Sequence, residues 1–190
     1  MRPSNSTDEN MTTYISLLRG INVSGQKKIK MAGLVSLYEA LGLKKVRTYV
    51  QSGNVIFDSA AGGARKLSQK IEEEIQKVFG FSVTVLIRTA AELQDVAENN
   101  LFLKKKATDI TKLHVTFLSE KPDKAALKQL ETIETGGDAF EVAEKHIYLY
   151  CPNGYGRTKL SNTFFEKKLK VAATTRNWNT VTALLEMAKK

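Results

Sequence analysis

The stretch that decides the fold is VRTYVQSGNVIFD, residues 46–58. Two runs rich in β-branched and aromatic residues, 46–50 and 54–58, flank the polar tetrapeptide QSGN, which is typical of a β-hairpin. Gly53 is expected to supply the positive φ that a tight turn requires. The other three residues of the tetrapeptide either serve only the turn or line a cleft with their polar side chains; they are Gln51, Ser52 and Asn54.

Outward from this hairpin, hydrophobic periodicity and turn residues predict one order of elements on each side. The predicted elements of the first half are a strand at 14–18, a helix at 32–41 ended by Gly42, the hairpin, a helix at 63–80, a strand at 82–87 and a helix at 90–99. Those of the second half are a strand at 112–118, a helix at 123–133 after Pro122, strands at 139–143 and 146–150, a helix at 157–169, a strand at 171–175 and a helix from Asn179, its expected cap.

The order β-α-β-β-α-β therefore occurs twice, each time followed by an extra helix. This order predicts an α+β fold made of two tandem ferredoxin-like units, with helices on one face of each sheet. We expect a disordered leader at residues 1–11, a first repeat at 12–100 and a second at 112–190. The linker between the repeats is short and partly apolar, so we expect them to pack as one compact unit.

Several long strings in this chain occur in the order typical of one protein family. They are LLRGINVSG (17–25), TYVQSGNVIF (48–57), PNGYGRTKLSN (152–162), Glu166 and TTRNWNTV (174–181). In these strings the chain resembles the bacterial family called domain of unknown function 1697, from about residue 14 to the C terminus. The resemblance implies a small soluble α+β protein, and it implies no activity, because none is established for that family.

The composition narrows the classes of function. The formal net charge is +9, with seven Lys or Arg against one acid in residues 19–47 and eight against two in residues 153–190. Such clustering favours an anionic partner, although a solvated basic surface would have the same composition. The single cysteine excludes a disulfide framework or a four-cysteine zinc site within one chain and fits the reducing cytoplasm. We predict no metal and no cofactor, because the two histidines are not at ligand spacing. No apolar run is long enough to span a membrane.

The first candidate site is the loop RGINVSGQKKIKM, residues 19–31, which follows the first predicted strand. It is longer than most connections between a strand and a helix, and such loops often carry function. The side chains expected to contact an anion are Arg19, Asn22, Lys27 and Lys28. Alternatively, Asn22 is only a turn former and Arg19 pairs with an acid in the sheet.

The second candidate is the loop CPNGYGRTKLSN, residues 151–162, between a strand and a helix expected to begin near Thr158. Glycines let backbone N–H groups approach a ligand, and a helix N-terminus favours an anion. The candidate side chains here are Asn153, Arg157, Lys159 and Asn162. A capped helix entry with turn glycines explains the same residues without any ligand.

Other residues allow both a functional and a structural interpretation. Arg176 and the single tryptophan, Trp178, suit either anion or partner binding or the anchoring of the last helix. Glu166 serves either as an acid or base or as the partner of Lys170. Three aromatic side chains share one face of the strand 146–150; they are His146, Tyr148 and Tyr150. They either stack bases, or the tyrosines pack against the sheet of the other repeat or line the cleft between the repeats. A pair of Cys151 with His146 is the one conceivable nucleophile.

These observations support three hypotheses about function. The first is a binding module for an anionic ligand, either nucleic acid or a phosphorylated metabolite, with a site near a cleft between the repeats. The second is a metal-independent enzyme that acts on a phosphorylated or carboxylated small molecule through Arg19, Lys159, Glu166 and Arg176. The third is a protein-interaction module. We expect a cytoplasmic monomer or homodimer.

Overall fold

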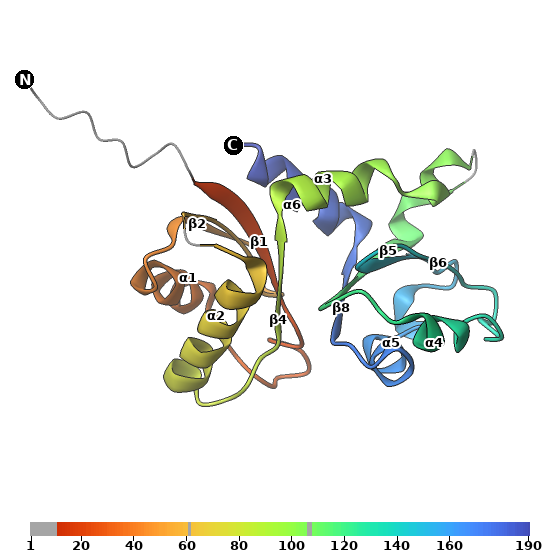
Figure 1. Cartoon of the computed structure of the whole chain (residues 1–190), viewed down its shortest axis with the longest axis horizontal. Coiled ribbons are helices and arrows are strands. Elements are labelled where there is room, and N and C mark those ends of the chain that lie inside the picture. Colours follow the sequence, from red (N-terminus) through yellow and green to blue (C-terminus); the bar gives the residue numbers. More distant parts are fainter. Residues whose placement is uncertain (1–10, 61, 106–107) are drawn as a thin grey trace, which may run out of the picture. The chain divides into compact units, whose positions relative to one another are not determined.

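The computed structural model describes residues 11–60, 62–105 and 108–190, so the predicted leader lies outside the described residues except for Met11. The chain divides into two compact units. The first comprises residues 11–91 with 187–190, and the second comprises residues 92–186. Each unit contains a four-stranded antiparallel sheet (Figure 1). The repeat boundaries expected from the sequence and the packing of the repeats stay predictions.

The first unit carries its sheet in the order β2-β3-β1-β4. Its elements are β1 (Thr12–Leu18), α1 (Met31–Ala40), β2 (Lys44–Tyr49), β3 (Asn54–Ser59), α2 (Ala64–Phe79) and β4 (Val85–Thr89). Helices α1 and α2 cover one face of this sheet (Figure 1). The apolar stripe of α2 consists of Leu67, Ile71 and Ile75, all of which are buried in the core between helices and sheet. Gly80 ends α2 with a φ of 80°, as the sequence predicts.

The second unit carries its sheet in the equivalent order β6-β7-β5-β8. Its elements are β5 (Leu113–Leu118), α4 (Lys124–Lys128), β6 (Ala139–Val142), β7 (His146–Tyr150), α5 (Asn162–Leu169) and β8 (Ala173–Asn177). Helices α4 and α5 cover one face, over a core that includes Ile147, Leu149 and Phe165 (Figure 1). The extra helices α3 (Ala90–Glu98) and α6 (Trp178–Ala188) follow β4 and β8. The α+β class is therefore confirmed.

Equivalent backbone hydrogen bonds mark corresponding positions in the two units. The amide of Leu18 at the end of β1 donates to the carbonyl of Gly53, and the amide of Leu118 at the end of β5 donates to the carbonyl of Lys145, both at 2.9 Å. Leu18 and Leu118 also face the first residues of β4 and β8 across their sheets. The residue before β3 in the first unit thus corresponds to the residue before β7 in the second.

Gly53 is required in the first hairpin for two physical reasons. Its φ is +72°, a conformation that costs a side-chain-bearing residue free energy. A Cβ at this position would also lie 2.7 Å from Leu18 Cβ and 2.7 Å from Ile21 Cδ1, closer than any normal contact. The positive φ expected from the sequence is confirmed, and the close approach to the end of β1 is an additional finding.

Three helix boundaries expected from the sequence are wrong. Helix α4 is confined to Lys124–Lys128, and Pro122 precedes its cap Asp123, so it does not lie in the first turn. Helix α5 begins at Asn162 because the Ser161 hydroxyl accepts from the amide of Phe164, which leaves residues 158–161 outside the helix. The cap of α6 is Asn177, whose side chain accepts from the amide of Thr180 at 2.8 Å; Asn179 lies within the helix.

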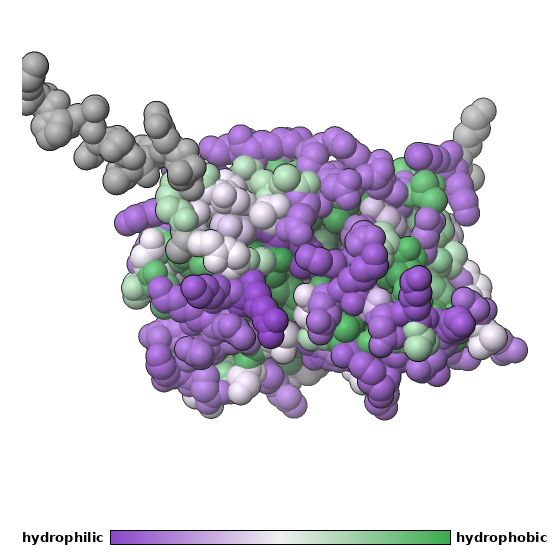
Figure 2. Space-filling view, viewed as in Figure 1, coloured by the Kyte–Doolittle hydropathy of each residue, from purple (hydrophilic) through white to green (hydrophobic). Residues whose placement is uncertain are grey.

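The surface that Figure 2 displays is mostly hydrophilic, with apolar residues in areas separated by polar side chains. Scattered apolar exposure of this kind is ordinary for a folded protein. Within residues 11–60, 62–105 and 108–190, no helix has both the length and the apolarity that crossing a membrane requires.

Candidate functional site

The loop that follows β7 encloses a small polar pocket in the second unit. The pocket has a volume of about 280 Å³ and is lined by Asn153, Arg157 and Lys159 together with Thr135, Gly136 and Asp138. Three of the four side chains that the sequence nominates in this loop therefore lie together. We call this the Arg157 pocket.

The backbone of the loop is held by contacts at both of its ends. Gly154, with a φ of 90°, begins a 3-10 turn over Tyr155–Arg157. The ring of Tyr155 stacks on His114 of β5, with centroids 4.8 Å apart. After the turn, the hydroxyl of Thr158 donates to Asp138 at 2.5 Å and accepts from the amide of Leu160 at 3.0 Å. The loop is therefore fixed to β5 on one side and to the start of β6 on the other.

The basic side chains of the Arg157 pocket are not engaged by other described residues. Within the described part of the chain, Asn153, Arg157 and Lys159 form no side-chain hydrogen bond or ion pair. The one acid in the lining, Asp138, already accepts the hydroxyl of Thr158. An arginine and a lysine exposed beside a short glycine loop can donate several charge-assisted hydrogen bonds to one small anion.

The first candidate loop, residues 19–31, is held by its own side chains. The amide nitrogen of Asn22 donates to the carbonyls of Ile29 at 3.0 Å and Gln51 at 2.7 Å, and its oxygen accepts from the amide of Ile29 at 2.9 Å. Lys27 donates to the carbonyl of Ser82 at 2.7 Å. These bonds join the loop to the hairpin turn and to the segment before β4, which explains its length through folding alone.

A second pocket, of about 660 Å³, lies beside this loop, and its lining contains both basic and acidic side chains. It is lined by Arg19, Lys27 and Lys77 together with Glu72 and Glu73. The Lys77 amine forms an ion pair with the Glu74 carboxylate at 3.3 Å. Lys28 is exposed and does not line the pocket. The pocket therefore offers an anion a weaker field than the lysine-rich sequence of the loop suggests.

The hairpin tetrapeptide serves its own turn. The amide nitrogen of Asn54, which is fully buried, donates to the carbonyl of Tyr49 at 3.0 Å and to the hydroxyl of Ser52 at 2.9 Å. The carbonyl of Gln51 accepts from Asn22, while its side chain is exposed. These contacts support the structural interpretation of all three residues.

Glu166 has a structural counterpart in the first unit. Its Oε1 accepts from the amide of Ala173, the first residue of β8, at 3.1 Å. In the first unit, Oε1 of Glu72 accepts from the amide of Val85, the first residue of β4, at 2.7 Å. Helix α2 in the first unit and helix α5 in the second thus each hold the start of the following strand through one glutamate, and this role explains Glu166 without acid–base chemistry.

Three further candidates lie away from the Arg157 pocket. Arg176 is buried on β8, where its Nη1 donates to the Thr174 hydroxyl at 2.8 Å, and burial lowers its pKa to about 10. The side-chain oxygen of Asn162 accepts from the Thr175 hydroxyl at 2.6 Å. Trp178 is buried as the first residue of α6, in line with the anchoring interpretation.

The conceivable nucleophile is not supported by its surroundings. His146 begins β7 and Cys151 follows the end of that strand, so the two side chains lie at opposite ends of it. Cys151 is fully buried, and burial, reinforced by the negative charge of Asp138, raises its pKa to about 11. A thiol that stays protonated at neutral pH is a poor nucleophile. In the described ranges, no cluster of His, Cys, Asp or Glu has the composition of a metal site.

The aromatic face of β7 is covered by α3 and by the residues that follow this helix. The hydroxyl of Tyr148 donates to the carbonyl of Val96 in α3 at 2.9 Å, and burial raises its pKa above its ordinary value. The ring of Tyr150 stacks on Phe102, with centroids 6.2 Å apart. Tyr148 is 2% exposed, so its ring offers no platform on which a base can stack.

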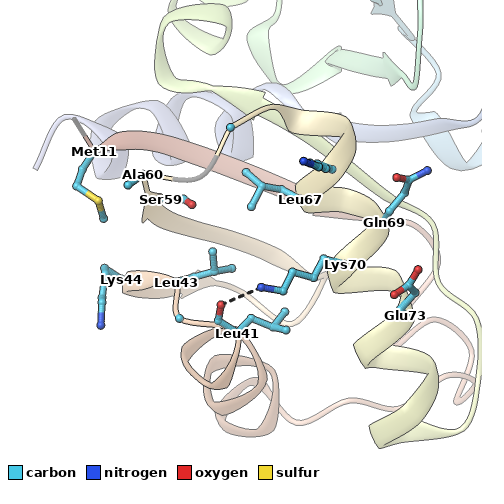
Figure 3. A pocket seen from close by; sticks show the side chains of 13 residues that line it. Met11, Leu41, Leu43, Lys44, Ser59, Ala60, Leu67, Gln69, Lys70 and Glu73 are labelled. Carbon is cyan, nitrogen blue, oxygen red and sulfur yellow. Dashed lines mark hydrogen bonds between the residues drawn. The ribbon is translucent and has the colours of Figure 1, made fainter.

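Sequence reasoning missed a pocket in the first unit at the beginning of α2. It has a volume of about 620 Å³ and lies between that helix and the start of β2 (Figure 3). Its apolar lining includes Leu43 and Leu67. Two lysines that are four residues apart on α2, Lys66 and Lys70, also line it. The helical spacing of these lysines beside Leu67 is the one sequence signal that could have indicated it.

Comparison with known proteins adds a family and a fold. The family described as Protein of unknown function (DUF1697) matches residues 11–148. The chain is similar to a solved structure titled as that of conserved bacterial protein SP0830 from Streptococcus pneumoniae, with 24% identity and a TM-score of 0.75. The similarity covers 94% of this chain and 99% of the other. No curated protein matches the chain.

Proposed function

The chain belongs to the family of proteins of unknown function DUF1697, and we propose that it binds a small anion, such as a phosphorylated or carboxylated metabolite, in the Arg157 pocket. The observation that carries the proposal is the pair Arg157 and Lys159, which line one small pocket without a partner among the described residues. A volume of about 280 Å³ suits one phosphate or carboxylate group with a small body attached.

The pocket favours a small molecule over nucleic acid. A nucleic-acid site neutralises a row of phosphates and commonly stacks bases on aromatic rings. The Arg157 pocket holds one arginine and one lysine, and the ring of Tyr148 is buried under α3. We therefore propose a ligand with a single anionic group, and the experiment below distinguishes it from nucleic acid.

We also propose that each unit is a ferredoxin-like repeat followed by an extra helix. The equal strand orders and the paired hydrogen bonds of Leu18 and Leu118 support this proposal. The predicted cytoplasmic location and the predicted monomer or homodimer stay predictions.

Isothermal titration of the full chain with inorganic phosphate, a sugar phosphate and a nucleoside monophosphate tests the binding proposal. We expect saturable binding of at least one of these ligands at physiological salt. The Arg157→Gln variant should weaken it by about tenfold or more, because a hydrogen bond to a charged group contributes about 1.5–3 kcal/mol. Since Arg157 is exposed, the substitution should leave the fold intact.

The matched control is Lys167→Gln, which removes one exposed positive charge from α5 outside the pocket. An equal loss of affinity in Arg157→Gln and Lys167→Gln would mean that only net charge matters. If Lys27→Gln, and not Arg157→Gln, lowers the affinity, the ligand binds at the loop 19–31. Binding of DNA or RNA that weakens steeply with salt, without binding of any small phosphate, would favour the nucleic-acid alternative.

A further inference from the structure

The pocket at the beginning of α2 lies where the core of the first unit reaches the surface. Leu43 and Leu67 belong to that core, and Leu41 packs against it. The side chains of these residues and of Met11 form an apolar lining between α2 and the chain that enters β2 (Figure 3). We call this the Leu43 pocket. Its volume of about 620 Å³ lies in the range of cavities that hold drug-sized molecules.

The rim of the Leu43 pocket carries three lysines and one acid. Lys66, Lys70 and Glu73 project from α2, and Lys44 begins β2. The amine of Lys70 reaches across the pocket toward the carbonyl of Leu41 at 3.4 Å, a long hydrogen bond (Figure 3). Lys44 and Lys66 form no side-chain bond to any other described residue. The rim therefore has excess positive charge beside an apolar surface.

This combination selects the class of ligand. An apolar molecule without a charge would leave the lysines unused, and an inorganic anion would leave the apolar part of the lining uncovered. We propose that the Leu43 pocket binds an amphiphilic monocarboxylate, whose apolar body covers Leu41, Leu43 and Leu67 and whose carboxylate contacts Lys66 and Lys70. This site is separate from the Arg157 pocket and does not depend on the function proposed for it.

The affinity should follow the length of the apolar body and the presence of the charge. Each methylene that leaves water changes affinity by about threefold to fourfold. Octanoate should therefore bind about tenfold more tightly than hexanoate. Acetate should not bind measurably, and octan-1-ol, which has the same chain without the charge, should bind more weakly than octanoate.

Isothermal titration of the full chain with octanoate, hexanoate, acetate and octan-1-ol tests the proposal. The double variant Lys66→Gln with Lys70→Gln should weaken the binding of octanoate by about tenfold and leave the affinity for octan-1-ol unchanged. The matched control is Lys124→Gln with Lys128→Gln, which removes two exposed lysines at the same spacing from α4 in the second unit. This control should leave octanoate binding unchanged.

Methyl NMR spectra of the same titration locate the bound molecule. The methyl signals of Met11, Leu41 and Leu43 should shift in a saturable way with octanoate. The proposal is overturned if octanoate does not bind, if acetate binds as tightly as octanoate, if both double variants lose affinity equally, or if the shifting methyl groups lie outside this pocket.

Discussion

The two units place chemically different pockets at equivalent corners of their sheets. In the first unit, the corner where β2 begins and β3 ends contains the Leu43 pocket, with leucines and lysines in its lining. In the second, the corner where β6 begins and β7 ends contains the Arg157 pocket, which is smaller and lined by polar and charged residues. One backbone frame thus carries two kinds of site, which differ in the side chains that line the equivalent corner.

A second difference concerns the loop after the first strand of each unit. Residues 19–30 of the first unit are clamped by Asn22 and Lys27, whereas the second unit passes from β5 to α4 through a shorter connection. The longer loop is also the more basic one, and its polar groups bind the protein itself. Length and charge in a loop therefore do not by themselves indicate a ligand site.

The largest expected effect is a difference in stability between substitutions in the turn before β3 and in the turn before β7. Gly53→Ala should lower the free energy of unfolding by about 2–4 kcal/mol, because it adds strain at positive φ to a clash with Leu18. Lys145→Ala at the equivalent position should cost less than about 0.5 kcal/mol, since this lysine is exposed and its ion pair with Glu92 is long. Chemical denaturation measures both.

Gly42→Ala serves as the control for Gly53, because Gly42 has a φ of +81° and open space around its Cβ position. We expect this change to lower the free energy of unfolding by about 1–2 kcal/mol, because of backbone strain alone. Equal costs for Gly42→Ala and Gly53→Ala would contradict the close packing of the hairpin turn on β1.

The next effect concerns the clamped loop. Asn22→Ala removes three hydrogen bonds and should destabilise the protein by about 1–3 kcal/mol, with faster amide exchange throughout residues 20–30. Phosphate binding should not change. If the variant folds but no longer binds phosphate, Asn22 is a ligand residue and our assignment of the loop is wrong.

A smaller effect is a dependence of stability on pH that belongs to the second unit. Burial lowers the pKa of His114 below its ordinary value of 6.5, opposed by a bond to the carbonyl of Lys112. Below pH 6.5 the unfolded chain then binds a proton before the folded chain does, so stability falls as pH falls through this window. Thermal unfolding between pH 7.5 and 5.5 measures this loss.

The variant His114→Phe keeps a ring against Tyr155 and removes the titrating group. The slope of stability against pH should become smaller in this variant. An unchanged slope would show that other groups cause the acid sensitivity.

The smallest effect on the fold, but a clear chemical one, concerns Cys151. Because burial raises its pKa to about 11, the native thiol should resist iodoacetamide at pH 8 and react only after denaturation. Rapid alkylation of the native protein, followed by mass spectrometry, would contradict the burial of this residue and reopen the nucleophile hypothesis.

The sequence was most informative where local chemistry decides the structure. Gly53 and Gly80 mark a turn and a helix end through backbone conformation alone, and the stripe of α2 follows from helical spacing. The prediction of a helix from 157 was wrong because the side chain of Ser161 offers a cap four residues later. A local pattern does not show at which of two possible positions a helix begins.

The candidate site was less predictable because its residues depend on distant partners. Asn22 bonds to Gln51, and Glu166 bonds to the start of β8; neither partner is visible in the local pattern. The grouping of Asn153, Arg157 and Lys159 was expected because these residues belong to one loop. The Leu43 pocket requires residues from the turn after α1, from β2 and from α2 together, so it appears only once the chain is folded.

The central claim is that the corner of the second unit binds phosphate and that the equivalent corner of the first, for which we propose an amphiphilic carboxylate, does not bind phosphate. Backbone amide NMR spectra of the full chain, titrated with inorganic phosphate, test this claim most directly. We predict saturable shifts confined to Asn153, Gly154, Arg157 and Lys159 and their sequence neighbours, with residues 59–66 unaffected. Saturable shifts in residues 19–30, or no saturable shift in the Arg157 pocket, would contradict it.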